Sequence, residues 1–123
     1  MLSWLEKKTW LSWSIVIFGA TAMFYLSSLT FGPGKPNILS IIYHISAFFC
    51  FALFLFIASI KRKKNYVGLL LMTTIAVAYG ILDEIHQFFV PGRSCSINDF
   101  VLDAGGIAFA SLIYLILILK KKK

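Results

Sequence analysis

Residues 38–64 read ILSIIYHISAFFCFALFLFIASIKRKK. Residues 38–60 form an apolar run without Asp, Glu, Lys or Arg, and four consecutive basic residues follow it at 61–64. The apolar part is longer than the about 20 residues that a helix needs to cross the hydrocarbon core of a bilayer. Four adjacent cations are costly inside a bilayer, so they place the end of this helix at a membrane surface. The stretch therefore predicts a transmembrane helix over residues 38–60.

Three further apolar runs flank this one, over residues 10–31, 66–90 and 100–119, and Pro, Gly or charge clusters separate them. The chain of 123 residues is 59% apolar, compared with roughly 45–50% in soluble domains. We predict an all-α membrane protein that is a bundle of about four transmembrane helices. Residues 1–123 are expected to form a single domain. A cleaved signal peptide is the alternative for residues 10–31. That run is longer than the apolar core of such peptides and lacks a small-residue cleavage site.

The basic residues are distributed unevenly over the two sides of this bundle. Ten of the twelve Lys and Arg lie near the chain ends or in the cluster at 61–64, and only Lys35 and Arg93 lie in the other two loops. Because cytoplasmic loops carry the excess of positive charge, both chain ends are predicted to be cytoplasmic. This pattern explains the net charge of +7 without a nucleic-acid partner, since no helix has a basic face. We expect the cell membrane as location and the lipid bilayer as partner, with the oligomeric state left open.

Polar residues gather at the opposite, outer end of the predicted bundle. They come from the start of the second run, the end of the third, the loop after it and the start of the fourth. The group comprises His44, Asp83, Glu84, His86, Gln87, Arg93, Asp99 and Asp103. Ionisable groups at membrane depth usually face a bundle interior or a wet cavity, so this group is the candidate site.

Helical periodicity predicts how the acidic residues are oriented. Asp83 and Glu84 are neighbours in sequence and point about 100° apart on one helix. Asp99, Asp103 and Gly106 share one stripe of the next helix, where the glycine allows another helix to approach closely. The loop between the two helices is short, so their acidic stripes are expected to face each other.

Two functions fit this group of side chains better than the others. The first is binding of a polar or anionic envelope molecule, such as an anionic lipid or a lipid-linked precursor, at headgroup depth. Its binding residues would be Arg93, which suits a phosphate, together with Gln87, His86 and Asp99. The alternative is an enzyme acting on a lipid head group, whose candidate catalytic residues are Asp83, Glu84, Asp103 and His44. Ion transport is disfavoured because the inner halves of the helices carry few polar groups.

Structural roles compete with each of these assignments. The segment from Ser96 to Asp99 fits a capping box in which the Asp99 carboxylate caps the helix start. Arg93 could form an ion pair that locks the bundle, and His44 could hydrogen-bond a carboxylate across helices. His44 and His86 with the carboxylates could also bind a metal, but no HExxH-type spacing supports this. We therefore expect neither a metal nor a cofactor.

Residues 79–94, YGILDEIHQFFVPGRS, resemble the VanZ-like family of membrane proteins. That family typically shows an acidic pair, then a Gln three positions after the second acid, then Pro-Gly-Arg. An Asp and a further Asp or Asn follow at the start of the next helix, and glycines come after them. The matching residues here are Asp83, Glu84, Gln87, Pro91, Gly92, Arg93, Asp99, Asp103, Gly105 and Gly106. His44 resembles the histidine of the family's second helix.

One position departs from the family pattern. Many members carry an Asp-Lys pair shortly before the histidine, whereas this chain has Ser40 and Ile41. The role of that lysine is therefore absent or is taken by Lys35. The resemblance implies a small multi-span membrane protein whose founding relative is associated with resistance to glycopeptide antibiotics such as teicoplanin. It implies no particular reaction.

Overall fold

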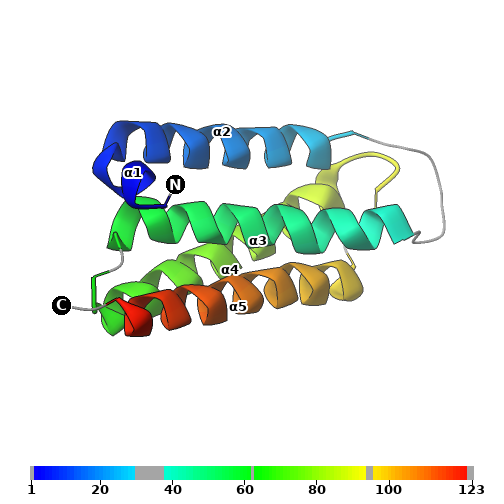
Figure 1. Ribbon diagram of the computed structural model, residues 1–123. Coiled ribbons are helices and arrows are strands. Elements are labelled where there is room, and N and C mark those ends of the chain that lie inside the picture. Colours follow the sequence, from blue (N-terminus) through cyan, green and yellow to red (C-terminus); the bar gives the residue numbers. More distant parts are fainter. Residues whose placement is uncertain (1, 30–37, 62, 94–95, 122–123) are drawn as a thin grey trace.

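A computed structural model of the chain describes residues 2–29, 38–61, 63–93 and 96–121, and the regular structure in them is entirely helical. A short helix, α1 (Leu2–Lys7), precedes four long ones, which are α2 (Thr9–Ser27), α3 (Ile38–Ile60), α4 (Tyr66–Phe89) and α5 (Ile97–Lys120). The long helices lie side by side (Figure 1), and each is long and apolar enough to cross a membrane. The prediction of an all-α bundle of about four such helices is confirmed.

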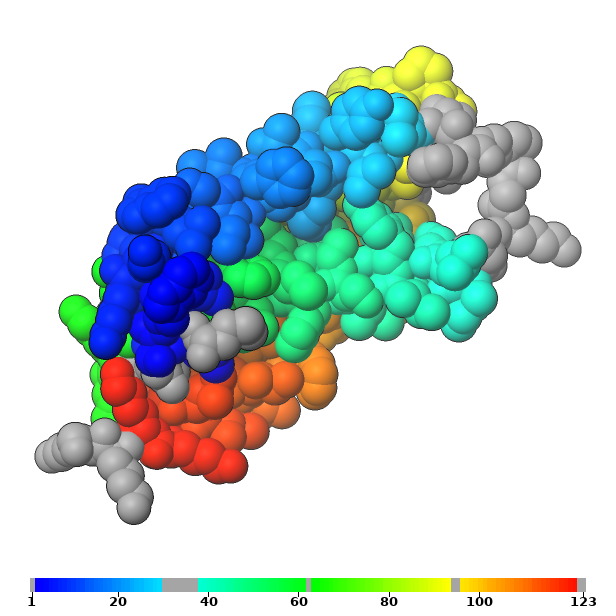
Figure 2. All heavy atoms as spheres, turned by 45° about the horizontal axis from the view of Figure 1, so that its top comes forward, coloured from blue at the N-terminus to red at the C-terminus, as the bar shows by residue number. Residues whose placement is uncertain are grey.

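Helix α3 occupies the centre of the bundle, where it contacts α1, α2, α4 and α5. It runs between α2 and α5 in Figure 1, and the space-filling view of Figure 2 shows it between them again. Its side chains Phe48, Ala52 and Phe56 are buried, and the Phe56 ring centroid lies 5.5 Å from that of Tyr114 on α5. A helix that is apolar on all sides is suited to this central position.

Helices α3 and α5 approach each other closely at Gly106. A Cβ atom at this glycine would overlap the carbonyl oxygen of Ile45 and would lie 3.1 Å from the backbone nitrogen of Phe49. Ala110, one turn further along α5, is fully buried. Small residues permit such backbone contact between membrane helices. The contact sets the spacing of α3 and α5 close to the residues of the candidate site.

Two helix boundaries differ from the predicted ones by more than one residue, and one short helix is additional. α2 ends at Ser27 instead of residue 31, and the predicted turn at 32–37, which includes Lys35, lies outside the described residues. α5 begins at Ile97 instead of residue 100 because the Ser96 hydroxyl accepts a hydrogen bond from the Asp99 backbone N–H at 3.4 Å. Helix α1 is not among the predicted elements. It is held by a hydrogen bond of 2.6 Å that the Ser12 hydroxyl donates to the Leu5 carbonyl oxygen.

The beginning of α1 and the end of α5 lie at one end of the bundle (Figure 1). The ends of α2 and α4 and the beginnings of α3 and α5 lie at the other, which we call the polar end because it carries the residues of the candidate site.

Candidate functional site

A tight turn after α4 positions Arg93. The Arg93 backbone N–H donates a hydrogen bond of 3.1 Å to the Val90 carbonyl oxygen, and Gly92 between them has φ of 80°. Pro91 at the second position and a glycine with positive φ at the third are the features of a type II turn. The turn directs the chain back from α4 toward α5 and leaves the arginine at the polar end.

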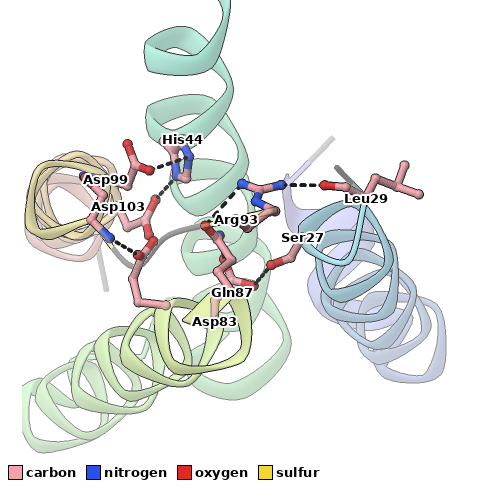
Figure 3. A network of polar contacts seen from close by, with 10 residues as sticks. Ser27, Leu29, His44, Asp83, Gln87, Arg93, Asp99 and Asp103 are labelled. Carbon is pink, nitrogen blue, oxygen red and sulfur yellow. Dashed lines mark hydrogen bonds and ion pairs between the residues drawn. The ribbon is translucent and has the colours of Figure 1, made fainter. Parts of the chain in front are cut away.

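His44 of α3 lies between two carboxylates of α5 (Figure 3). Its Nδ1 is 2.7 Å from Oδ1 of Asp103, and its Nε2 is 3.8 Å from Oδ2 of Asp99. His44 and Asp103 are buried, whereas Asp99 is partly exposed. This arrangement follows from the close approach of α3 and α5 and from the shared stripe of the two aspartates on α5.

Glu84 of α4 completes a group that we call the histidine–carboxylate cluster, consisting of His44, Glu84, Asp99 and Asp103. Oε2 of Glu84 accepts a hydrogen bond of 3.0 Å from the Ser96 backbone N–H. Its other oxygen, Oε1, is buried and has no hydrogen-bond partner among the described residues, and the same holds for Oδ2 of Asp103. Ligand atoms of His44, Glu84 and Asp103 all lie within 4.8 Å of one another. Groups with these properties can exchange protons or bind a cation.

A second network, the α2–α4 clamp, consists of Ser27, Asp83, Gln87 and Arg93 (Figure 3). The Ser27 hydroxyl donates a hydrogen bond of 2.6 Å to Oδ1 of Asp83, and Gln87 Nε2 donates one of 3.1 Å to Oδ2. Arg93 donates to Gln87 Oε1 at 3.1 Å and to the Leu29 carbonyl oxygen at 3.0 Å. The latter bond satisfies a carbonyl just beyond the end of α2, where no helical partner is available.

The acidic pair of α4 is therefore divided between the two networks. Asp83 is hydrogen-bonded to Ser27 of α2, and Glu84 is hydrogen-bonded to Ser96, the residue that precedes α5. Of the acidic pair, it is Glu84 and not Asp83 that faces the acidic stripe of α5, since ligand atoms of Glu84 and Asp103 lie close together. Asp83 does not take part, because its two oxygens accept the bonds from Ser27 and Gln87.

His86 and Arg93 have surroundings that the sequence did not indicate. Nε2 of His86 is 2.8 Å from the Ser28 hydroxyl, and its ring stacks on Phe24 with centroids 4.1 Å apart. It belongs to the contact between α2 and α4 and lies apart from the histidine–carboxylate cluster. Among the described residues, Arg93 forms no ion pair with a carboxylate, so the predicted locking pair is not present there.

The predicted capping box at the start of α5 is formed only in part. Ser96 caps the helix as expected, but its own N–H donates to Glu84. The Asp99 side chain lies near His44 instead. The reading of Asp99 as the capping carboxylate is thus wrong, because a carboxylate from α4 occupies that role.

Ser27 is the residue of the site that sequence reasoning missed. It is 3% exposed and makes the bond to Asp83 across helices. A serine in an apolar run usually bonds the carbonyl four residues earlier in its own helix, as Ser14 does here. Nothing in the sequence distinguishes the two cases, so only the packing of α2 on α4 reveals its partner.

Two grooves run beside the acidic pair, one on each side of α4. The first has a volume of about 240 Å³ and is lined by Ile81, Glu84, Ile85, Ser96, Ile97 and Phe100. The second has a volume of about 340 Å³ and is lined by Phe24, Tyr79, Leu82, Asp83, Ile85 and His86. Each groove thus combines mainly apolar walls with one carboxylate of the pair.

Comparison with known proteins agrees with the resemblance that residues 79–94 indicate. Residues 3–119 match the VanZ/LLP1 family, so the match reaches from α1 into the last turn of α5. None of the curated proteins and none of the solved structures compared with the chain matches it. The family match and the four apolar helices together lead to one conclusion: the chain is a multi-pass membrane protein that belongs to the VanZ/LLP1 family.

Proposed function

We propose that the polar end binds a polar or anionic molecule of the cell envelope. In this proposal residues 1–123 form one VanZ-like domain in the cell membrane, both chain ends are cytoplasmic, and the polar end faces outward. The orientation is supported by the ten basic residues near the chain ends and at 61–64, compared with only two in the other loops. Labelling of a single cysteine introduced at each loop, in intact cells with an impermeant maleimide, tests it. Labelling of a cysteine at residue 63 but not at residue 92 would show that the orientation is opposite to the proposed one.

The observation that carries the binding proposal is the groove beside Glu84. Its apolar walls are formed by Ile81, Ile85, Ile97 and Phe100, and its lining also includes Ser96 and the buried Glu84. A molecule with an acyl chain and a polar head would place the chain along these apolar side chains and its head at the polar end. This combination of an apolar wall with a few polar groups is typical of ligand sites.

Arg93 is the residue that we expect to hold an anionic head group. A guanidinium group has five N–H donors, and two hydrogen bonds join this one to the described residues, at Gln87 and Leu29. Its position at the end of α4 is held by these bonds and by the turn, which favours bidentate contact with a phosphate. The partly buried position also keeps it near headgroup depth.

Native mass spectrometry of the protein purified from its own membrane in mild detergent tests this role. We expect a co-purifying anionic lipid in the wild type and its loss in Arg93→Ala, with partial retention in Arg93→Lys. Lys64→Ala removes an exposed cation from the connection between α3 and α4, helices that meet at the opposite end of the bundle (Figure 1), and should leave the lipid in place. Equal lipid retention in wild type and Arg93→Ala would contradict the proposal, as would equal loss in Lys64→Ala.

A second candidate function, chemistry on a lipid head group, is favoured by one observation. The His44 imidazole and the Asp103 carboxylate are 2.7 Å apart and buried, as in pairs that transfer protons during catalysis. Incubation of the reconstituted protein with envelope lipids, followed by mass spectrometry of the lipids, would detect turnover. Turnover that Asp103→Asn abolishes and Asp83→Asn retains would support an enzyme, and turnover unchanged in Asp103→Asn would exclude this mechanism.

For the cellular role, we propose a contribution to glycopeptide tolerance, which rests on family membership. Deletion of the gene should then increase sensitivity to teicoplanin, and a plasmid copy should restore growth. A copy with Arg93→Ala should fail to restore it if binding of an envelope molecule underlies tolerance. Unchanged sensitivity after deletion would contradict this role while leaving the binding proposal intact.

A further inference from the structure

The histidine–carboxylate cluster contains more carboxyl groups than the described residues provide cations to pair with them. It contains three carboxylates and one imidazole, and among the described residues no Lys or Arg forms an ion pair with any of them. Burying carboxylates away from water is expensive unless a counter-charge or hydrogen bonds accompany them. Glu84 and Asp103 are 4% and 0% exposed, so water outside the bundle does not provide the compensation.

Two oxygens of this cluster have no partner at all in the described part of the chain. They are Oε1 of Glu84 and Oδ2 of Asp103, both fully buried. Asp83, one residue from Glu84, shows the contrast, because both of its oxygens accept hydrogen bonds. A buried carboxylate oxygen without a partner in the protein is suited to accept a proton or to bind an ion or a water molecule.

We propose that His44, Glu84 and Asp103 bind one divalent transition-metal ion. A ligand atom from each residue lies within 4.8 Å of those from the other two. Metal–ligand bonds to imidazole nitrogen and carboxylate oxygen are about 2.0–2.2 Å long. Side-chain shifts on the order of 1 Å therefore suffice to bring the three atoms around one ion.

The ligand types select the class of metal. One imidazole nitrogen with two carboxylate oxygens suits Zn²⁺ or Mn²⁺, whereas Mg²⁺ and Ca²⁺ prefer oxygen ligands alone. Asp99 lies 3.8 Å from Nε2 of His44 and is only partly exposed. It lies within ion-pair distance of the ring nitrogen that faces away from Asp103, the position where carboxylates around metal-bound histidines are usually found.

Three protein ligands leave at least one coordination position open. An oxygen atom of a phosphate or carboxylate could occupy it, which would explain how an acidic cluster and an anionic head group share one end of the bundle. The metal site does not depend on that head group, since the metal alone is the probe in the test below.

The test measures metal binding to the full-length protein in mild detergent after removal of metals with a chelator. We expect Zn²⁺ or Mn²⁺ to bind at about one ion per chain in calorimetric titrations, and elemental analysis after dialysis should retain that ion. Glu84→Gln, Asp103→Asn and His44→Gln should each weaken binding by at least about tenfold. Asp83→Asn and His86→Gln are matched controls, with the same chemical change outside the cluster, and should bind as the wild type does.

Glu84→Gln is the decisive variant because its amide oxygen can still accept the hydrogen bond from the Ser96 N–H. Gel filtration and circular dichroism identify any variant that fails to fold. The inference is overturned if the wild type retains no ion after dialysis, if folded Glu84→Gln binds as tightly as the wild type, or if Asp83→Asn loses the ion to the same extent. Loss of lipid in Arg93→Ala with metal binding unchanged would separate this site from the head-group proposal.

Discussion

Replacing Gly106 with alanine should force α3 and α5 apart near the polar end. The added Cβ would overlap the Ile45 carbonyl oxygen and would lie 3.1 Å from Phe49 N and 3.2 Å from the Ile45 carbonyl carbon, whereas ordinary contacts begin at 3.4 Å. All three atoms belong to the backbone of α3, so no side-chain rotation can relieve the overlap. The helix itself must move, and His44 is the residue next to Ile45.

The magnitude follows from two opposing effects. Alanine is favoured over glycine within a helix by about 1 kcal/mol, whereas overpacking of a close contact costs about 1–3 kcal/mol. Gly105→Ala provides the matched control, because a Cβ at that position would have no described atom within 4 Å apart from the neighbouring backbone of α5 itself. Both variants gain the same helix propensity, so their difference in the free energy of unfolding isolates the steric cost. We expect Gly106→Ala to be less stable than Gly105→Ala by about 1–3 kcal/mol.

Reversible unfolding in mixed micelles, with SDS as denaturant and circular dichroism as signal, measures this difference. Gly105→Ala should be as stable as the wild type or more stable. The metal titration offers a second reading, since separation of the helices should also weaken binding in Gly106→Ala alone. Equal free energies of unfolding for the two alanine variants would refute the conclusion that Gly106 sets the spacing of α3 and α5.

Three other substitutions probe how the peripheral elements are attached, each by the same unfolding measurement. Ser27→Ala removes a buried hydrogen bond of 2.6 Å to Asp83 and should lower the free energy of unfolding by about 1–2 kcal/mol. If the same change has no further effect in a protein that already carries Asp83→Asn, the two side chains act together. Tyr79→Phe removes a hydrogen bond of 2.6 Å to the Ala20 carbonyl oxygen of α2 and should lower the free energy of unfolding by about 1 kcal/mol. Thr74→Val is the control, because it removes a hydroxyl at an exposed position and should have little effect. Gly92→Ala introduces a side chain at φ of 80° and should lower the free energy of unfolding by about 1–2 kcal/mol. A variant as stable as the wild type would argue against the type II turn.

Much of the candidate site could be anticipated from sequence, but its division could not. The eight predicted residues all lie at the polar end, because helix lengths and directions bring the end of α4 and the starts of α3 and α5 together. Their roles diverge, since Asp83 bonds Ser27 of α2 while Glu84 lies near His44 and Asp103. An angle of about 100° between neighbours follows from helix geometry. Which partner each one meets depends on how the helices are rotated.

Apolar length, charge clusters and the Pro-Gly turn are properties of residue order alone. The thickness of the bilayer requires about 20 apolar residues for each crossing, so four helices could be counted, and their all-helical fold follows because a bilayer offers no partners for open backbone groups. Rotation of each helix about its axis is different, because in lipid every face of an apolar helix is acceptable to the solvent. It is decided by contacts between distant residues, such as Gly106 against the Ile45 backbone. Only the tertiary structure could therefore place His44 between Asp99 and Asp103.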